Sequence, residues 1–239
     1  MAIIEQLWCV VPAAGRGLRF GGAWPKQYLE LAGKPLLRWT LDALAAHPRV
    51  AGIVVVLAAD DSRWRVVEAI AGKPVLTAVG GQSRADSVLA GLDALPQSVG
   101  TECFVLIHDA VRPCVRAEDI DRLIDLGIPA GGALLAAPVR DTLKRADASG
   151  AVLTTETRET RWRALTPQMF RRGELSAALQ RLRAGGVAAS DESMAMEHAG
   201  HRPLLVEGAE DNIKVTTPSD FALVAHLLNV SGSARQIRT

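Results

Sequence analysis

The 239-residue sequence has little of what marks several broad classes of protein. Aromatic residues make up 4% of the chain and include one tyrosine, so we expect no stacking platform for single-stranded nucleic acid. A basic surplus is also missing, because 27 lysine and arginine residues face 26 aspartate and glutamate residues. No apolar run approaches the roughly 18–20 residues that a membrane helix needs. We therefore expect neither nucleic acid nor a membrane as a partner.

Cysteine is scarce as well. Cys9, Cys103 and Cys114 show no C-x-x-C spacing, and an odd number does not suit a disulfide framework. The N-terminus carries Glu5 and has no basic segment before its apolar stretch, which argues against a secretory signal. Since hydrophobic residues make up 49% of the chain and charged residues 22%, a sizeable core is expected. We predict a cytoplasmic globular protein.

Short runs rich in valine and isoleucine alternate with helical patterns, which predicts an α/β fold with a Rossmann-like, doubly wound and mostly parallel sheet. The predicted strands cover residues 7–12, 53–58, 74–79, 103–108 and 133–137. Between the first two strands, Leu37, Leu41 and Leu44 recur at the spacing of one helix face. The same spacing predicts helices around residues 88–95, 120–124 and 221–228. We predict that residues 1–239 form a single domain.

Residues 140–163 break this alternation. The segment is polar and rich in threonine and arginine, with a turn signal at residues 148–150. It predicts two polar strands joined by a turn, and such a hairpin is too hydrophilic to form a core alone. We therefore predict an arm that lies on a second copy of the chain, so that the protein is a homodimer.

A loop of small residues follows the first predicted strand. Residues 10–22 read VVPAAGRGLRFGG, and glycine lets backbone N–H groups approach a phosphate closely. The dinucleotide fingerprint G-x-G-x-x-G fails because Phe20 stands at its last glycine position. The P-loop pattern fails because no Gly-Lys-Ser/Thr closes the loop. The failed fingerprint weakens one alternative function, a nicotinamide-dependent oxidoreductase.

Three cations accompany this loop. Arg16, Arg19 and Lys26 lie within eleven residues of Gly15, with almost no acidic residues among them. Three positive charges around a glycine loop suit a triphosphate better than the pyrophosphate of a dinucleotide. On these residues alone, a solvated turn with ordinary surface charge stays open as the alternative.

Several motifs together resemble one enzyme family. The first joins AAGRGLR at residues 13–19 to PKQY at residues 25–28. The others follow in order: GGQSRADSV at 80–88, HDAVRP at 108–113, APVRDT at 137–142, ALTPQ at 164–168 and DNIKVT at 211–216. They resemble the nucleotidyltransferases that activate sugar and polyol phosphates. Within these, the chain is most similar, over about residues 8–228, to the 2-C-methyl-D-erythritol 4-phosphate cytidylyltransferases of non-mevalonate isoprenoid synthesis.

The resemblance implies a nucleotidyltransferase fold and the transfer of a cytidylyl group from CTP to 2-C-methyl-D-erythritol 4-phosphate, a polyol phosphate, with release of pyrophosphate. It places the nucleotide at Ala13, Ala14, Gly15, Arg19, Lys26, Gly80, Gly81, Gln82 and Ser87. It places the acceptor at Asp109, Arg112, Thr142, Arg158, Thr166, Ser190 and Lys214. Of these residues, Arg19, Lys26, Arg158 and Lys214 are the catalytic candidates. The implied cofactor is Mg²⁺, with Asp109 as its candidate ligand.

At two of these positions the chain differs from the family, and one residue is expected to act in the partner subunit. The family often has an acidic residue where Gln82 stands, and usually a threonine where Ser190 stands. The resemblance implies that Arg158 crosses to the active site of the partner subunit and grips the substrate phosphate there. A homodimer would then be part of the catalytic machinery, which explains why a polar arm is kept.

Local patterns add interpretations of their own. A capping-box pattern at residues 83–86 follows Gly81 and predicts the start of a helix, whose N–H groups can bind a polar ligand or serve only as an ordinary cap. Asp109 follows the fourth predicted strand, at the edge where open α/β sheets bind ligands. It can hold Mg²⁺ there or pair with Arg112 as a clamp within the loop. His108 is expected to be structural.

The implied reaction needs no general base, because the second pKa of a phosphate monoester is about 6 and the nucleophile is already ionised near neutral pH. Cations that bring two polyanions together are the chemical requirement. A ribitol-5-phosphate cytidylyltransferase remains the nearest alternative function. An RNA-binding module that uses the arginines of the arm is a further alternative, which the even charge balance disfavours.

Overall fold

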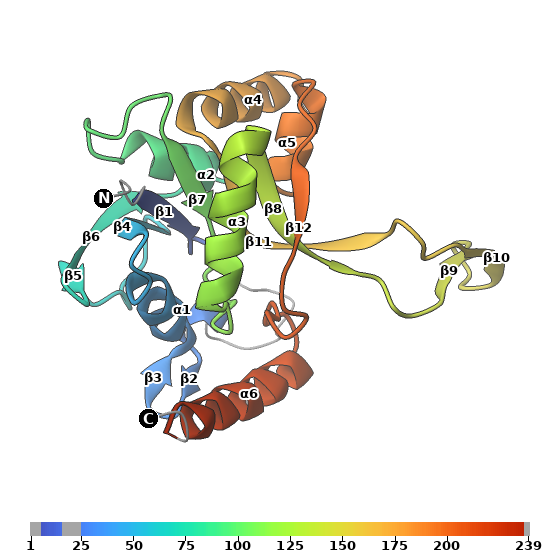
Figure 1. Cartoon of the computed structure of the whole chain (residues 1–239), viewed down its shortest axis with the longest axis horizontal. Helices are drawn as coiled ribbons and strands as arrows, with labels where there is room; N and C mark the ends of the chain where they lie inside the picture. The colour runs from blue at the N-terminus through green and yellow to red at the C-terminus, as the bar shows by residue number, and fades with distance from the viewer. Residues whose placement is uncertain (1–5, 16–24, 237–239) are drawn as a thin grey trace.

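A computed structural model describes residues 6–15 and 25–236, and side chains among these up to residue 228. Within this part of the chain, eight strands form one sheet in the order β12-β8-β11-β7-β1-β4-β6-β5. Their bounds are Leu7–Pro12 (β1), Val50–Leu57 (β4), Ala69–Ile70 (β5), Lys73–Val79 (β6), Phe104–Ile107 (β7), Gly132–Pro138 (β8), Trp162–Arg171 (β11) and Leu204–Glu207 (β12). Figure 1 shows this sheet at the centre of the molecule, with a hairpin projecting to one side.

The sheet is mostly parallel, as predicted. β1 runs parallel to β4 and β7, β4 to β6, and β8 to β12. β11 lies antiparallel between β7 and β8, and the short β5 is antiparallel to β6. The carboxyl ends of β1, β4, β6 and β7 therefore meet at one edge, where the loops of an open α/β sheet collect ligands.

Helices cover both faces of this sheet. Their bounds are Leu36–Ala45 (α1), Arg84–Asp93 (α2), Ala117–Ala130 (α3), Arg172–Ala184 (α4), Glu192–His198 (α5) and Pro218–Gln236 (α6), with a 3-10 turn η2 at Lys26–Tyr28. One core cluster joins leucines of α1 and α3 to one face, and another joins α2, α4 and α5 to the other. This two-sided packing confirms the doubly wound arrangement. No helix in the described ranges is both long and apolar enough to cross a membrane.

The five predicted strands all exist, with ends shifted by up to three residues. β11 has no counterpart among the predicted strands, and its own sequence explains why. Its first residues are exposed and its last are buried, so neither alternation nor a continuous apolar run describes it. Pro167 lies inside it, and proline argues against a central strand. The pairing with β8 shifts register between Ala164 and Gln168, which accommodates this proline.

The polar segment at residues 140–163 contains the predicted hairpin, but its last residues, Trp162 and Arg163, already belong to β11 of the central sheet. β9 (Leu143–Ala146) pairs antiparallel with β10 (Val152–Glu156) as a separate two-stranded sheet. Asp147 closes the turn, because its Oδ1 accepts hydrogen bonds from the backbone N–H groups of Ser149 and Ala151. The hairpin extends away from the central sheet, and Val152 and Leu153 on it are about 60% exposed. Short strands β2 (Glu30–Leu31) and β3 (Lys34–Pro35) form a third sheet.

Gly91 sets how closely α2 approaches the sheet, and this generates a prediction about stability. A Cβ at Gly91 would lie 2.3 Å from Val10 Cγ1 and 2.8 Å from Val56 Cγ2. Gly91→Ala should lower the free energy of unfolding by ~1–3 kcal/mol through overpacking, although alanine favours a helix by about 1 kcal/mol. Urea unfolding measures this change.

Gly100→Ala is the matched control, because a Cβ there meets open space. It should change the free energy of unfolding by less than about 0.5 kcal/mol. Equal values for the two variants would show that α2 tolerates a larger separation from the sheet.

Candidate active site

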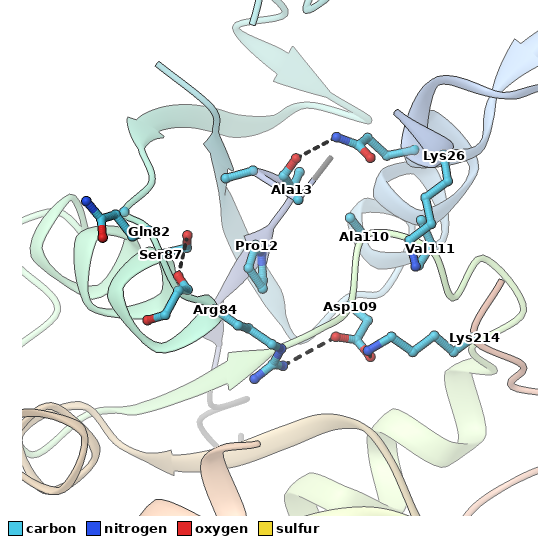
Figure 2. Close-up of a pocket in the computed structure, with 15 residues that line it drawn as sticks. Pro12, Ala13, Lys26, Gln82, Arg84, Ser87, Asp109, Ala110, Val111 and Lys214 are labelled. Atoms are coloured by element: carbon cyan, nitrogen blue, oxygen red, sulfur yellow. Dashed lines mark hydrogen bonds and ion pairs between the residues drawn. The ribbon is translucent and has the colours of Figure 1, made fainter. Parts of the chain in front are cut away.

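A pocket of about 210 Å³ opens at the carboxyl ends of β1 and β7, beside the start of α2. Seven of the predicted nucleotide residues line it: Ala13, Ala14, Gly15, Lys26, Gly81, Gln82 and Ser87. Asp109 and Lys214, predicted for the acceptor, line the same pocket. In Figure 2, Gln82 and Ser87 lie on one side of the pocket, and Lys26 and Lys214 lie on the opposite side. Segments far apart in sequence thus form one site.

The loop after β1 and the loop before α2 pack tightly against each other. A Cβ at Gly80 would lie 2.7 Å from both Ala14 Cβ and Ser87 Oγ, so only glycine lets the two loops approach this closely. The predicted capping box is confirmed: the Ser83 side chain accepts from the Asp86 N–H, and the Asp86 carboxylate accepts from the Ser83 N–H. These contacts fix the wall of the pocket that the first turn of α2 provides.

Asp109 is the electrostatic centre of the pocket. Its Oδ1 lies 3.3 Å from Arg84 Nη2, and its Oδ2 lies 3.1 Å from Arg112 Nε and 3.0 Å from Lys214 Nζ. Burial alone would raise the pKa of Asp109, but the charges of Arg84, Lys214 and Arg112 outweigh burial and hold the pKa well below its usual range. Asp109 is therefore an anion that orders three cations, and the pairing with Arg112, which was the alternative interpretation, is one part of this cluster.

A chain of hydrogen bonds beneath the pocket fixes the backbone of Asp109. Its N–H donates to Thr166 Oγ1, which lies 3.0 Å from His108 Nδ1. His108 Nε2 lies 3.0 Å from the backbone oxygen of Arg112, and this acceptor requires the proton on Nε2. Thr166 must then donate to Nδ1. His108 is fully buried in this chain of bonds, which confirms the expectation that it is structural.

Two lysines approach the pocket from the same side. Lys26 Nζ donates to the backbone oxygen of Val215 at 3.1 Å, next to Lys214 in sequence. Gln27, which follows Lys26, is buried, and its Nε2 donates to the backbone oxygen of Ala13 at 2.7 Å. The 3-10 turn that carries Lys26 is thus tied to the end of β1 and to the segment of Lys214. Lys26, Lys214 and Arg84 therefore line the same pocket as the carboxylate of Asp109.

The other predicted site residues that the structure describes do not line this pocket. Arg112 and Lys214 line a neighbouring hollow, in which Asn212 and Asp220 also take part. Thr166 is buried below the pocket. Thr142, Arg158 and Ser190 are exposed and line neither hollow. Arg158 lies beyond the hairpin and donates to the backbone oxygen of Arg140. Arg16 and Arg19 lie outside the described residues.

Arg84 and Glu192 were not among the predicted site residues. Glu192 is fully buried at the first turn of α5, and its carboxylate binds both terminal nitrogens of Arg84. The sequence signal was incomplete: Arg84 falls within the capping box, which predicts a helix start but not the direction of its side chain. Glu192 follows Asp191, which caps α5 by accepting from the Met194 N–H.

The donors around Asp109 do not fit a Mg²⁺ ion held by the protein. Mg²⁺ in proteins is bound by one or two carboxylates together with phosphates and water. Both oxygens of Asp109 already face cations, and Glu192 is engaged by Arg84. In the described part of the chain, no three histidine, cysteine, aspartate or glutamate side chains gather as metal ligands would.

The family model and the curated relatives that match this chain carry the same description. Residues 7–229 match the family model described as IspD, 2-C-methyl-D-erythritol 4-phosphate cytidylyltransferase. A protein of that description from Xanthomonas campestris pv. campestris (strain 8004) is 61% identical over 218 residues, which cover 91% of this chain and 82% of the relative.

Solved structures agree with this comparison. A crystal structure of a 4-diphosphocytidyl-2C-methyl-D-erythritol synthase is 35% identical, with a TM-score of 0.80, and covers 94% of this chain and 99% of its own. The 2-C-methyl-D-erythritol 4-phosphate cytidylyltransferase of Francisella tularensis is 28% identical, with a TM-score of 0.79, and covers 93% and 100%.

The buried histidine generates a prediction about pH. Burial lowers the pKa of His108 from 6.5 to about 4. Between these pH values the unfolded chain binds a proton that the folded protein does not. The free energy of unfolding therefore rises with pH, and the contribution of the neutral His108 to stability is lost as the pH falls. One pKa unit corresponds to about 1.4 kcal/mol, so His108 should remove ~2 kcal/mol between about pH 6.5 and pH 5.

Urea unfolding of the unaltered protein and of His108→Gln at pH 7 and pH 5 checks this value. The variant should be less stable at pH 7 but should lose less stability on acidification, by the amount that His108 contributes. An identical pH dependence in both proteins would show that other groups control the acid response.

Proposed function

The chain belongs to the 2-C-methyl-D-erythritol 4-phosphate cytidylyltransferase family, and from this premise we propose that its pocket transfers the cytidylyl group of CTP to 2-C-methyl-D-erythritol 4-phosphate. The products are 4-diphosphocytidyl-2-C-methyl-D-erythritol and pyrophosphate, and the reaction serves non-mevalonate isoprenoid synthesis. One observation carries the proposal: a small-residue loop, a capped helix start and the cations Lys26 and Lys214 line one pocket together with the buried carboxylate of Asp109.

The chemistry is a substitution at phosphorus. An oxygen of the acceptor phosphate forms a bond to the α-phosphorus of CTP, while the bond from this phosphorus to the bridging oxygen of the departing pyrophosphate breaks. The attacking oxygen needs no base, because a phosphate monoester is largely ionised near neutral pH. A buried, neutral His108 agrees with this, since its nitrogens are engaged by Thr166 and Arg112.

Positioning and charge supply the rate enhancement. Backbone groups of residues 13–15 and of Gly80 and Gly81 bind the nucleoside together with Gln82 and Ser87. Arg19 and Lys26 bind the triphosphate and the charge that develops on the pyrophosphate. On the acceptor side, the proposed contacts are Asp109, Arg112, Thr142, Arg158, Thr166, Ser190 and Lys214.

Mg²⁺ is proposed as a counter-ion that arrives on the triphosphate. Bound to the phosphates, such an ion would neutralise part of their negative charge. The protein itself contributes the cations Arg84, Arg112 and Lys214, which the buried carboxylate of Asp109 holds beside the pocket. A cytoplasmic location completes the proposal.

A homodimer supplies the remaining acceptor contact. Within one chain, Arg158 follows the end of β10 by two residues, its side chain donates to the backbone oxygen of Arg140, and it does not line the pocket. We therefore assign its phosphate contact to the active site of the partner subunit. The exposed apolar residues of β10, Val152 and Leu153, would be covered in the same assembly.

The proposed function is tested by pyrophosphate release. CTP, UTP and ATP are each combined with 2-C-methyl-D-erythritol 4-phosphate and with ribitol 5-phosphate. Turnover is expected with CTP and the methylerythritol acceptor, and Lys26→Ala should lower it by roughly 10²–10³-fold, as for the loss of a preorganised charge. The control Arg181→Ala changes an exposed cation of α4 and should leave turnover unchanged.

The substrate pairs distinguish the alternatives. Turnover with ribitol 5-phosphate alone would replace the proposed acceptor, and no turnover with CTP would reject the cytidylyl transfer itself. Near-normal turnover of Lys26→Ala would remove this lysine from the mechanism.

If each active site combines Lys26 of one chain with Arg158 of its partner, two inactive variants should complement each other. Lys26→Ala and Arg158→Ala should each be nearly inactive alone. In mixed dimers, one of the two sites then receives both defects and the other receives neither, so an equal random mixture should regain about a quarter of the normal activity, as two-fold symmetry requires. Subunit exchange followed by a pyrophosphate assay measures the recovery, and tagged subunits verify that mixed dimers form. If mixed dimers form without recovery, Arg158 acts within its own chain.

A further inference from the structure

We propose that Arg84 and Glu192 form a buried positioning pair that orients Asp109 for the acceptor and links the nucleotide side of the pocket to the acceptor side. This inference rests on the proposed function. Neither residue is among those that sequence resemblance assigned to the site. Both are placed by contacts that cross large separations in sequence.

The geometry makes Arg84 a bridge between two carboxylates. Its Nη1 and Nη2 bind the two oxygens of Glu192, with 3.0 Å between Nη2 and Oε2. The same Nη2 lies 3.3 Å from Asp109 Oδ1. Only a planar guanidinium fork can bind one carboxylate with two nitrogens and reach a second carboxylate at the same time. Figure 2 shows Arg84 extending from the start of α2 to Asp109, with Lys214 on the other side of that carboxylate.

Arg84 binds the oxygen of Asp109 that Arg112 and Lys214 do not contact. Arg112 and Lys214 both contact Oδ2, whereas the described contact of Oδ1 is with Arg84. Without Arg84 the carboxylate plane is held at one oxygen and can turn. Lys214, which lies 3.0 Å from Oδ2, would turn with it. The orientation of both proposed acceptor contacts therefore depends on this guanidinium.

Glu192 is itself anchored to the central sheet, so the bridge is rigid. Gln168 of β11 accepts from the Ser193 N–H at 2.7 Å and donates to Asp191 Oδ2 at 3.0 Å. These bonds flank Glu192 on both sides in sequence. Burial raises the pKa of Glu192, and the charge of Arg84 opposes this shift. The acid serves as the buried counter-ion of Arg84, and it holds the guanidinium at a fixed distance from Asp109.

Because of its position in the chain, Arg84 connects the nucleotide side of the pocket with the acceptor side. It is the first residue of α2, directly after Ser83 and close to Gly81 and Gln82 of the proposed nucleoside wall. Its backbone is thus part of the nucleotide side, and its side chain ends at the acceptor side. Loss of the side chain should affect the acceptor far more than CTP, because the backbone of the capped helix start remains.

Three proteins test the pair against the unaltered enzyme. Arg84→Lys keeps the charge but removes the fork. Arg84→Met combined with Glu192→Leu removes both charges and fills a similar volume, a replacement that buried ion pairs often tolerate. Arg183→Ala is the control, because Arg183 is an exposed cation of α4 whose Nη1 lies 3.6 Å from Oδ1 of Asp86, a residue of the helix that carries Arg84. Thermal unfolding, kcat and separate KM values for CTP and the acceptor are measured for each.

We expect Arg84→Lys and the double variant to raise KM for the acceptor, or lower kcat/KM for it, by roughly tenfold, with KM for CTP changed by less than about twofold. The double variant should remain folded, which separates positioning from stability. Arg183→Ala should match the unaltered enzyme in all constants.

Acceptor constants that stay normal in both Arg84 variants would overturn the inference and leave the pair a purely structural one. The inference is overturned in the same way if Arg84→Lys fails to fold and the double variant is fully active. If the unaltered protein itself shows no turnover with CTP, the proposed function fails instead, and this outcome is separate from the behaviour of the variants.

Discussion

The site depends on one buried anion. Asp109 sits at the end of a parallel strand with three cations on its two oxygens, and these come from the start of α2, from its own loop and from the segment before α6. A buried charge without partners is strongly unfavourable, and so is a buried partner left behind when one member is removed. The carboxylate and its cations therefore hold each other in place, and three segments distant in sequence close around the pocket as a result.

This arrangement allows a positive site within a chain of nearly even charge. With 27 basic and 26 acidic residues, the average says little about where charge collects. Lys26 and Lys214 face the pocket from one side and Arg84 from the other. Asp109, the anion that orders Lys214 and Arg84, lines the same pocket, and Thr166 and His108 beneath it fix its backbone. Phosphates can then meet cations that are already oriented, which lowers the reorganisation needed during the reaction.

Much of the frame was predictable from the sequence, because local patterns encode it. Valine-rich runs marked the parallel strands, leucine spacing marked α1, and the capping box marked the start of α2. Contacts between distant residues have no such signature. The pair of Arg84 and Glu192, 108 residues apart, and the insertion of β11 between β7 and β8 follow from tertiary packing. Lys214 was identifiable only by resemblance, since an isolated lysine in an alternating segment is usually a surface residue.

The acceptor side also agrees with the proposed contribution of a second chain. Arg112 is largely committed, because its Nε binds Asp109 and its Nη1 donates to the backbone oxygen of Asn212. Lys214 already neutralises Asp109. An incoming phosphate with two negative charges would therefore compete for cations that a buried carboxylate holds. A hairpin that projects from the sheet and pairs only with itself in the described chain is marginal alone. In the proposed dimer, docking on the partner would stabilise the hairpin and would bring Arg158 to the acceptor phosphate as a further positive charge.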